Sequence, residues 1–145
     1  MIYTEQTKKA ILLAFQAHEG QKDRSGLPYV MHPIHLAEQM TTEDACVVAM
    51  LHDVLEDTDM TVEDLRAHDF SEKQIHAVEL LTRTKEEDYF EYIRRLKDDP
   101  LARSVKLADL AHHMDRTRLK DWTDQDETRR EKYAEALRIL TEETR

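Results

Sequence analysis

The sequence predicts an all-α protein: a single-domain helical bundle of about seven or eight helices spanning residues 1–145. The chain contains only two glycines and three prolines, whereas turn-rich β architectures need many such residues. Apolar residues make up 40% of the chain, and they fall in short segments with helical spacing between residues that commonly cap helices. The length suits one domain around one buried core.

The N-terminal part is predicted to hold two helices separated by the longest loop of the chain. The first helix is expected over about residues 4–18, with apolar side chains at positions 11, 12, 14 and 15 on one face. Gly20 stands where a glycine often ends a helix. A loop is expected over residues 20–31, which hold both glycines. Pro33 favours the first turn of a short helix over residues 32–40.

The remaining helices are predicted from residues whose side chains cap a first turn. Thr42 precedes a strongly apolar helix, EDACVVAMLHDVLED, over residues 43–57. Thr61 with Asp64, and Ser71 with Gln74, form capping patterns before the next two helices. The last three helices are expected over residues 85–97, 101–116 and 124–142, the final one after the capping residue Thr123.

Composition excludes several classes of function. The formal net charge is −10, and no basic stripe is present that could displace counterions from DNA or RNA phosphates. Cys46 is the single cysteine, so neither an intrachain disulfide nor a cysteine-based zinc site is expected. The N-terminus lacks a secretory signal, and no apolar run reaches the length of a membrane span. We expect a cytoplasmic protein without nucleic-acid or membrane partners, and its oligomeric state stays open.

One apolar helix carries four residues whose side chains could bind a metal ion or transfer protons. His52, Asp53, Glu56 and Asp57 follow a run of apolar residues from 46 to 51. A His-Asp pair alone is usually a surface pair, but buried charges normally occur only when they are paired or bind a metal. His52 and Asp53 could reach one ion, and Glu56 and Asp57 lie one helical turn further on.

Two residues elsewhere could complete the ligands of that ion. His32 follows the glycine-bearing loop, and Asp109 lies in an apolar helix. Two imidazoles and two carboxylates without sulfur suit Mn²⁺, Fe²⁺, Co²⁺ or Zn²⁺, whereas an all-oxygen set favours Mg²⁺ or Ca²⁺. We interpret four other histidines as ordinary helical or surface residues, namely His18, His35, His68 and His76.

The chain resembles the HD hydrolases related to the hydrolase half of the RelA/SpoT alarmone enzymes. The resemblance runs through residues 14–37 (AFQAHEGQKDRSGLPYVMHPIHLA), 49–61 (AMLHDVLEDTDMT) and 105–115 (VKLADLAHHMD). LLTRTKEEDYFEYIRRL and RREKYAEAL are similar to connecting and final helices of short, standalone bacterial members. The resemblance implies the HD-domain fold.

The family resemblance also implies a reaction. By this likeness His32, His52, Asp53 and Asp109 hold one divalent ion, usually Mn²⁺, and the residues for proton transfer are Glu56 and Asp57. The expected reaction is attack of water on the ribose-proximal phosphorus of a nucleotide 3′-diphosphate, with release of pyrophosphate. The expected partner is therefore a small phosphorylated nucleotide such as (p)ppGpp or (p)ppApp.

Substrate contacts are expected from the loop and from the last helix. Lys22, Arg24 and Ser25 lie where the family places basic nucleotide-binding residues. The chain has Asp23 where alarmone hydrolases have an arginine that stacks on guanine, and His113 where they have an asparagine near the ribose. Arg129 and Tyr133 resemble phosphate-contacting residues of metazoan standalone members. The two departures leave the base of the substrate open.

Three alternative functions stay open at this point. The chain could hydrolyse another phosphorylated nucleotide, such as an adenine alarmone or the 2′-phosphate of NADPH. It could be a nucleotide sensor without turnover, although a sensor does not need Glu56 and Asp57. It could also hold two irons and oxidise its substrate, which would require extra ligands such as His112 or His113.

Overall fold

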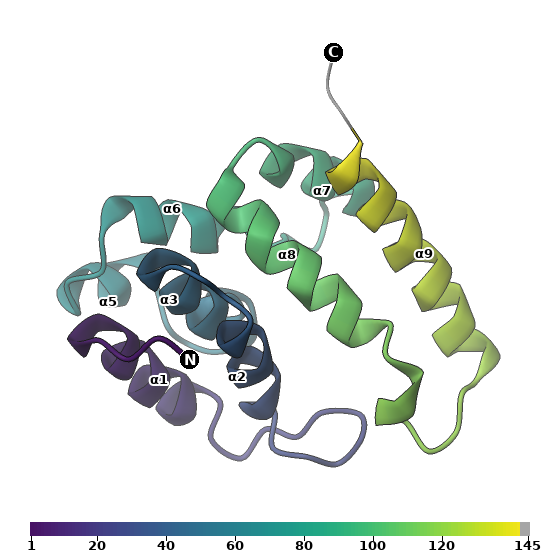
Figure 1. The fold of residues 1–145 in the computed structure, drawn as a ribbon, viewed down its shortest axis with the longest axis horizontal. Coiled ribbons are helices and arrows are strands. Elements are labelled where there is room, and N and C mark those ends of the chain that lie inside the picture. Colours follow the sequence, from purple (N-terminus) through teal and green to yellow (C-terminus); the bar gives the residue numbers. More distant parts are fainter. Residues whose placement is uncertain (143–145) are drawn as a thin grey trace.

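The computed structural model describes residues 1–142, and helices form its whole framework (Figure 1). The elements are α1 (Glu5–Ala17), α2 (Met31–Glu38), α3 (Glu43–Leu51), α4 (Val54–Asp57), α5 (Val62–Ala67), α6 (Glu72–Leu80), α7 (Tyr89–Lys97), α8 (Pro100–His113), the 3₁₀ turn η1 (Arg116–Arg118) and α9 (Asp124–Thr141). The sequence predicted α3 and α4 as a single helix. Counted in that way, the α-helices of residues 1–142 agree with the expected bundle of seven or eight, and the all-α class is confirmed.

Helix starts follow the predicted caps, because capping is a local property of a few neighbouring residues. Thr61, Ser71 and Thr123 each form a reciprocal capping box with the residue three positions later, and the Thr42 side chain accepts a hydrogen bond from the amide of Ala45. The predicted start at residue 85 is wrong. The Asp88 carboxylate accepts from the first amides of α7, so the helix begins at residue 89.

The central helix of the bundle is α3, whose residues 45–51 are all buried. It packs against α1, α2, α6 and α8. In turn, α8 lies between the layer that contains α2 and α3 and the outer helices α7 and α9, with which it also packs (Figure 1). His52, which directly follows α3, and Asp109 of α8 are both buried within this bundle.

The predicted helix over residues 43–57 breaks at His52 and Asp53. His52 is the last capping residue of α3, and Asp53, at φ −107° and ψ 0°, precedes the single turn α4. The backbone of Asp53 leaves the helical region and lies in the sparsely populated bridge region. At this bend, Nε2 of His52 lies 2.9 Å from the Asp53 carboxylate and 3.6 Å from Oδ1 of Asp109 in α8.

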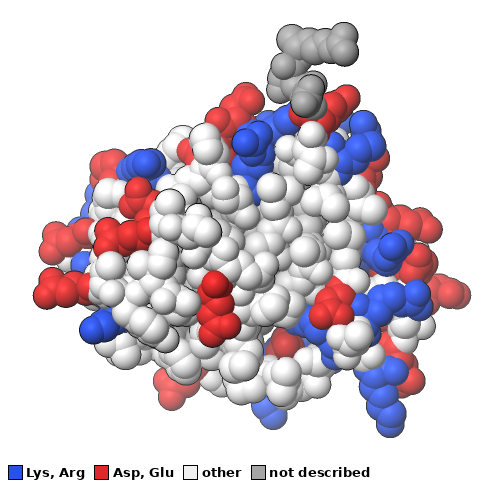
Figure 2. Space-filling view, in the orientation of Figure 1, with Lys and Arg blue, Asp and Glu red and all other residues white. Residues whose placement is uncertain are grey.

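Charged side chains gather around the rim of the face seen in Figure 1, and few lie over its centre (Figure 2). The helices of residues 1–142 include none with the length and apolarity that a bilayer span requires.

Candidate metal centre and active site

Three buried side chains from three helices converge between α2, α3 and α8. Ligand atoms of His32, His52 and Asp109 lie within 4.8 Å of one another. The Nε2 atom of His32 is 2.8 Å from Oδ1 of Asp109, and Nε2 of His52 is 3.6 Å from the same oxygen. Two imidazole nitrogens and a carboxylate oxygen are a donor set that binds divalent transition metals.

Asp53 brings a second carboxylate to this cluster. Its Oδ2 atom lies 2.9 Å from Nε2 of His52 and also accepts a hydrogen bond from the Tyr29 hydroxyl. The structure thus brings together the four residues that the sequence singled out as ligands, although they come from three separate stretches of chain.

The environment of His52 fits a metal ligand. Its Nδ1 lies 2.7 Å from the carbonyl oxygen of Ala49, and because a carbonyl only accepts, the proton stays on Nδ1. The Nε2 atom is buried, and although the Asp53 carboxylate lies 2.9 Å away, it makes no hydrogen bond of acceptable geometry with the residues that the structure describes. Although burial opposes it, the carboxylates of Asp53 and Asp109 raise the pKa of His52 well above its usual value. The two carboxylates thus favour positive charge at Nε2, which a divalent ion would supply.

A buried lysine fixes the orientation of Asp109. The ammonium of Lys106 is 2.9 Å from Oδ2 of Asp109, while Oδ1 faces His32 and also lies 3.1 Å from Nε2 of His113. Although burial opposes it, Lys106 and His113 hold the pKa of Asp109 well below its usual value. One carboxylate oxygen is therefore occupied by Lys106 and the other is presented to the cluster.

Glu56 and Asp57 form a second acidic group with Asp53, and oxygens of the three lie within 4.8 Å of one another. Burial raises the pKa of Glu56, and the nearby charges of Asp53 and Asp57 add to the shift. Burial and the Asp53 charge likewise raise the pKa of Asp57. Carboxylates with raised pKa values exchange protons closer to neutral pH than ordinary ones, as proton transfer to and from a substrate requires.

Two cavities adjoin the cluster. The inner cavity, of about 270 Å³, is lined by residues that include Asp53, Glu56, Asp57, Arg83, Lys132 and Tyr133. The loop cavity, of about 240 Å³, is lined by residues that include Lys22, Arg24, Ser25, His32 and Arg118. Tyr29 and His113 line both cavities. A ligand that filled both would pass directly over the cluster.

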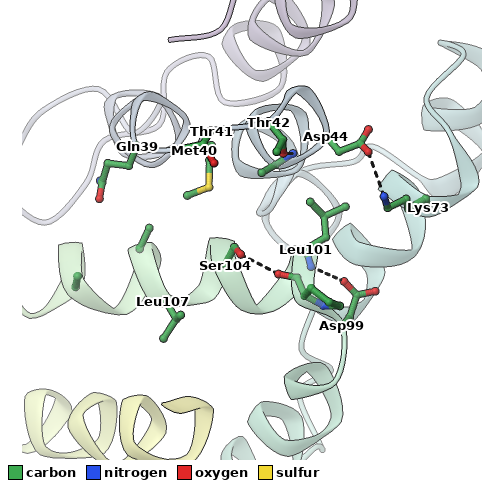
Figure 3. Close-up of a pocket in the computed structure, with 14 residues that line it drawn as sticks. Gln39, Met40, Thr41, Thr42, Asp44, Lys73, Asp99, Leu101, Ser104 and Leu107 are labelled. Carbon is green, nitrogen blue, oxygen red and sulfur yellow. Dashed lines mark hydrogen bonds and ion pairs between the residues drawn. The ribbon is translucent and has the colours of Figure 1, made fainter.

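A larger cavity, of about 720 Å³, lies on the opposite side of α8 and has a different character (Figure 3). No histidine lines it, and its charged side chains already have structural partners. The Asp99 carboxylate caps α8, and Asp44 lies 3.4 Å from the ammonium of Lys73. The buried histidines and aspartate that could bind a metal therefore lie on the other side of α8.

Comparisons with known proteins agree with this geometry. No family model matches the chain. The guanosine-3′,5′-bis(diphosphate) 3′-pyrophosphohydrolase of Aquifex aeolicus is 32% identical over 119 residues, which cover 74% of this chain and 17% of that protein. The bifunctional (p)ppGpp synthase/hydrolase SpoT of Escherichia coli is 35% identical over 122 residues, again 74% of this chain and 17% of the relative.

A solved structure of a metazoan ortholog of SpoT that hydrolyses ppGpp superposes with a TM-score of 0.76 and 25% identity, covering 97% of this chain and 88% of that one. In sequence and fold, the chain is similar to the RelA/SpoT-type hydrolases. It spans less than a fifth of the length of the curated relatives described above.

In this RelA/SpoT-like domain, Asp23 organises the loop before His32. Its Oδ1 accepts hydrogen bonds from the amides of Ser25 and Leu27 and from the Ser25 hydroxyl. Its Oδ2 lies 3.4 Å from the guanidinium of Arg118. The carboxylate that replaces the family's arginine is therefore engaged within the protein, and a guanidinium from η1 stands beside it in the loop cavity.

The expected substrate-binding residues fall into two groups. Lys22, Arg24, Ser25 and His113 line the loop cavity, and His113 and Tyr133 line the inner cavity. Arg129 lies outside the lining of both; its guanidinium is 3.2 Å from Asp126, which also pairs with Arg24. Asp126 thus joins the loop to α9.

Sequence reasoning missed several residues of the RelA/SpoT-like site. Tyr29 lies three positions before His32, and Lys106 lies three positions before Asp109. This one-turn spacing to an expected ligand is a signal that could have identified them. The interpretation of His18 as an ordinary helical or surface residue is wrong. It is 2% exposed, because its ring packs on Tyr29 at 4.8 Å and its Nδ1 lies 2.8 Å from the Gln21 amide oxygen.

Two more histidines surround the ring of His32. His112 Nδ1 is 2.6 Å from His32 Nδ1, the nitrogen that faces away from Asp109, and the two rings stack. Burial and the positive charge of Arg118 lower the pKa of His112 to about 3, which keeps this ring neutral. His112 therefore supports the position of His32 from behind, whereas His113 adjoins Asp109 directly.

Proposed function

We propose that this domain is a metal-dependent pyrophosphohydrolase that acts on a nucleotide 3′-diphosphate such as ppGpp and releases pyrophosphate. The observation that carries the proposal is the buried convergence of His32, His52 and Asp109, with Asp53 and the acidic pair Glu56 and Asp57 beside it. The likeness to a guanosine-3′,5′-bis(diphosphate) 3′-pyrophosphohydrolase and to a SpoT ortholog that hydrolyses ppGpp supports the choice of reaction. A cytoplasmic location suits such a substrate.

The four residues of the cluster would hold one divalent ion, and Mn²⁺ is our choice by resemblance to the family. When bound, such an ion lowers the pKa of water and polarises a phosphoryl oxygen. The protein supplies imidazole nitrogens from His32 and His52, and it supplies carboxylate oxygens from Asp53 and Asp109. Ala49 and Lys106 orient two of these four ligands through hydrogen bonds.

Glu56 and Asp57 supply the groups for proton transfer. Their raised pKa values allow one of them to accept a proton from the attacking water and to return it to the ribose oxygen that leaves. Glu56 is the better oriented of the two, because its Oε1 accepts a hydrogen bond of 2.8 Å from the amide of Arg83. We therefore assign proton transfer to Glu56 first, with Asp57 in support.

The nucleotide would lie across both cavities. The loop cavity, with Lys22, Arg24 and Ser25, suits the nucleoside, and the inner cavity, with Tyr133, suits phosphate. His113, which lines both, would lie near the ribose. Arg129 would act mainly by holding Asp126 and hence Arg24 in place.

The test is metal analysis combined with a panel of substrates. Purified protein, with and without added Mn²⁺, is assayed for pyrophosphate and phosphate release from ppGpp, pppApp and NADPH. We expect one bound ion per chain and pyrophosphate release from a 3′-diphosphate. Phosphate release from NADPH would favour a 2′-phosphatase, and nucleotide binding without turnover would favour a sensor. Two irons per chain would favour a redox enzyme. Each of these outcomes would overturn the proposal.

Variants separate the roles of individual residues. Asp53→Ala is expected to lose both the ion and turnover, whereas Glu56→Gln should keep the ion and lose activity by about 10²- to 10⁴-fold, the usual contribution of a positioned acid-base group. Glu86→Gln neutralises an exposed glutamate that makes no side-chain contact with the site, and it serves as the matched control. Full activity of Glu56→Gln would exclude Glu56 from proton transfer.

A further inference from the structure

Positive side chains surround one tyrosine on the wall of the inner cavity. The guanidinium of Arg83 lies 5.3 Å from the centre of the Tyr89 ring, and the ammonium groups of Lys132 and Lys106 lie 4.6 Å and 6.0 Å from it. Three separate segments supply these cations: the stretch between α6 and α7, the helix α8 and the helix α9. All four residues line the inner cavity.

Two of the three cations have no carboxylate of their own. Lys106 pairs with Asp109. Arg83 donates through Nε to the backbone oxygen of Glu87, whose carboxylate is engaged by Arg95 at 2.8 Å. Lys132 forms no ion pair within residues 1–142 and contacts only aromatic rings as a cation.

Arg83 and Lys132 line the same cavity, and they lie close enough for their positive charges to repel each other. Burial lowers the pKa of Lys132, and the positive charges of Arg83 and Arg129 add to the effect. Like charges held close together are unfavourable unless an anion lies between them. The arrangement is therefore one that an anionic ligand would stabilise.

The Tyr89 hydroxyl gives a second, independent indication. It is buried and has no hydrogen-bond partner among the described residues. Buried hydroxyl groups are nearly always bonded, so an orphaned one beside a cavity indicates a missing partner. A phosphoryl oxygen accepts from a hydroxyl and from cations alike, and it would satisfy Tyr89, Arg83 and Lys132 together.

The cavity wall that carries Arg83, Tyr89 and Lys132 lies close to the candidate metal centre. The amide of Arg83 donates a hydrogen bond to Glu56, one of the acidic residues that line the same cavity. Next to Lys132, the Tyr133 ring lies 5.6 Å from the ring of His113, which in turn contacts Asp109. An anion held by Arg83 and Lys132 is therefore a close neighbour of a phosphoryl group at the cluster.

We propose that Arg83, Lys132 and Tyr89 form a subsite for the terminal phosphoryl group of a 3′-diphosphate. The inference rests on the proposed function and deepens it by naming what selects a diphosphate over a monophosphate. In the reaction, an oxygen from water bonds to the ribose-proximal phosphorus while the bond from that phosphorus to the ribose oxygen breaks. The ribose oxygen takes up a proton, and both phosphorus atoms depart together as pyrophosphate. The subsite holds the second of them throughout.

The direct test is calorimetric binding of inorganic pyrophosphate and inorganic phosphate to the full chain, with and without Mn²⁺. We expect the wild-type protein to bind pyrophosphate at least tenfold more tightly than phosphate. Arg83→Gln and Lys132→Met should each weaken pyrophosphate binding about tenfold and change phosphate binding less than twofold. Tyr89→Phe should have a smaller effect in the same direction. Lys85→Met, which neutralises an exposed lysine near Arg83, should behave as wild type.

A kinetic comparison checks the specificity. Arg83→Gln and Lys132→Met should lower kcat/KM for a nucleotide 3′-diphosphate about tenfold or more, with the loss absent for the matching 3′-monophosphate. Equal binding of pyrophosphate and phosphate by the wild type, or unchanged pyrophosphate binding in both variants, would overturn the subsite. The variants could also lose binding of a nucleoside 5′-diphosphate while they keep pyrophosphate binding. That result would place the two cations at the 5′ end of the nucleotide and would also overturn the subsite.

The two proposals fail in different ways. A wild-type protein that hydrolyses no nucleotide 3′-diphosphate, yet binds pyrophosphate through Arg83 and Lys132, would overturn the proposed function and leave the subsite standing. Turnover of a 3′-diphosphate that is insensitive to both variants would overturn the subsite alone. Thermal unfolding of each variant shows that the measured losses arise in a folded protein.

Discussion

The ammonium group of Lys106 lies 2.9 Å from Oδ2 of Asp109, and both side chains are buried beneath the inner cavity. Lys106 also lies 5.1 Å from the centre of the Tyr92 ring. The pair neutralises a carboxylate that would otherwise be isolated in the interior. Since the other oxygen of Asp109 faces His32, the stability of the fold and the shape of the candidate metal centre depend on the same contact.

Replacing this lysine is expected to cost stability. Lys106→Met leaves Asp109 buried without its cation, and breaking a buried pair costs about 3–5 kcal/mol. Urea unfolding should show that loss in metal-free protein, and added Mn²⁺ should recover part of it because a bound ion stabilises only the folded state. Lys97→Met, on the outer helix α7, is the control. A free energy of unfolding equal to that of wild type would contradict the role given to Lys106.

Tyr29 is expected to tune metal affinity through Asp53. Its hydroxyl donates to the Asp53 carboxylate, and its ring packs against His18 and His32. Tyr29→Phe keeps the packing and removes the donor. Loss of such a supporting hydrogen bond typically lowers metal affinity 10- to 100-fold, which titration calorimetry with Mn²⁺ can measure. Tyr3→Phe alters a tyrosine that is 69% exposed and should leave the affinity unchanged.

The features that sequence reasoning predicted correctly are those encoded by close neighbours in the chain. The caps at Thr61 and Ser71 need only three following residues, and the structure confirms them. The break at His52 and Asp53 was missed because the apolar helical pattern continues through these residues, with no proline or glycine to mark an end. The burial of His18 depends on Tyr29 folding back over it.

Sequence reasoning also failed to predict the contacts between residues distant in the chain that form the inner cavity. Arg83 and Lys132 are 49 positions apart and become neighbours only because α7 and α9 pack together. Neither residue has a local pattern that separates it from an ordinary surface cation. The four expected ligands were accessible from sequence because each lies in a short family block, whereas the cations around Tyr89 required the tertiary structure.

Gln74 is expected to contribute to stability through a buried network. Its side chain, 1% exposed, donates to Asp44 at 2.8 Å and to Gln6 at 2.9 Å, and accepts from the amide of Ser71. Gln74→Met keeps the volume and removes these bonds, and leaving buried polar partners unsatisfied costs about 1–3 kcal/mol. Chemical denaturation measures the loss. Gln39→Met changes an exposed glutamine that bonds only to its own helix, and a loss as large in this control would contradict the network.

Asp126 is expected to make stability depend on pH through the contact between the loop and α9. Its carboxylate accepts from the amide and hydroxyl of Thr123 and pairs with Arg24 and Arg129. The hydrogen bond from the Thr123 amide and the Arg24 contact lower the pKa of Asp126 to about 2. An unfolded aspartate titrates near pH 3.9. Because the folded pKa is the lower one, the stabilisation is complete above the unfolded value and is lost as pH falls through the folded value.

The variant Asp126→Asn isolates this contribution. We expect the wild type to have the higher Tm at pH 7, with a difference that stays constant down to about pH 5 and shrinks between about pH 4 and pH 2. Circular dichroism melts across this range measure the difference, and Asp121→Asn, an exposed aspartate near the same helix, should show none. The variant should also raise KM for the nucleotide, since Arg24 lines the loop cavity. A Tm difference that grows on acidification would show that another group, and not Asp126, carries the pH dependence.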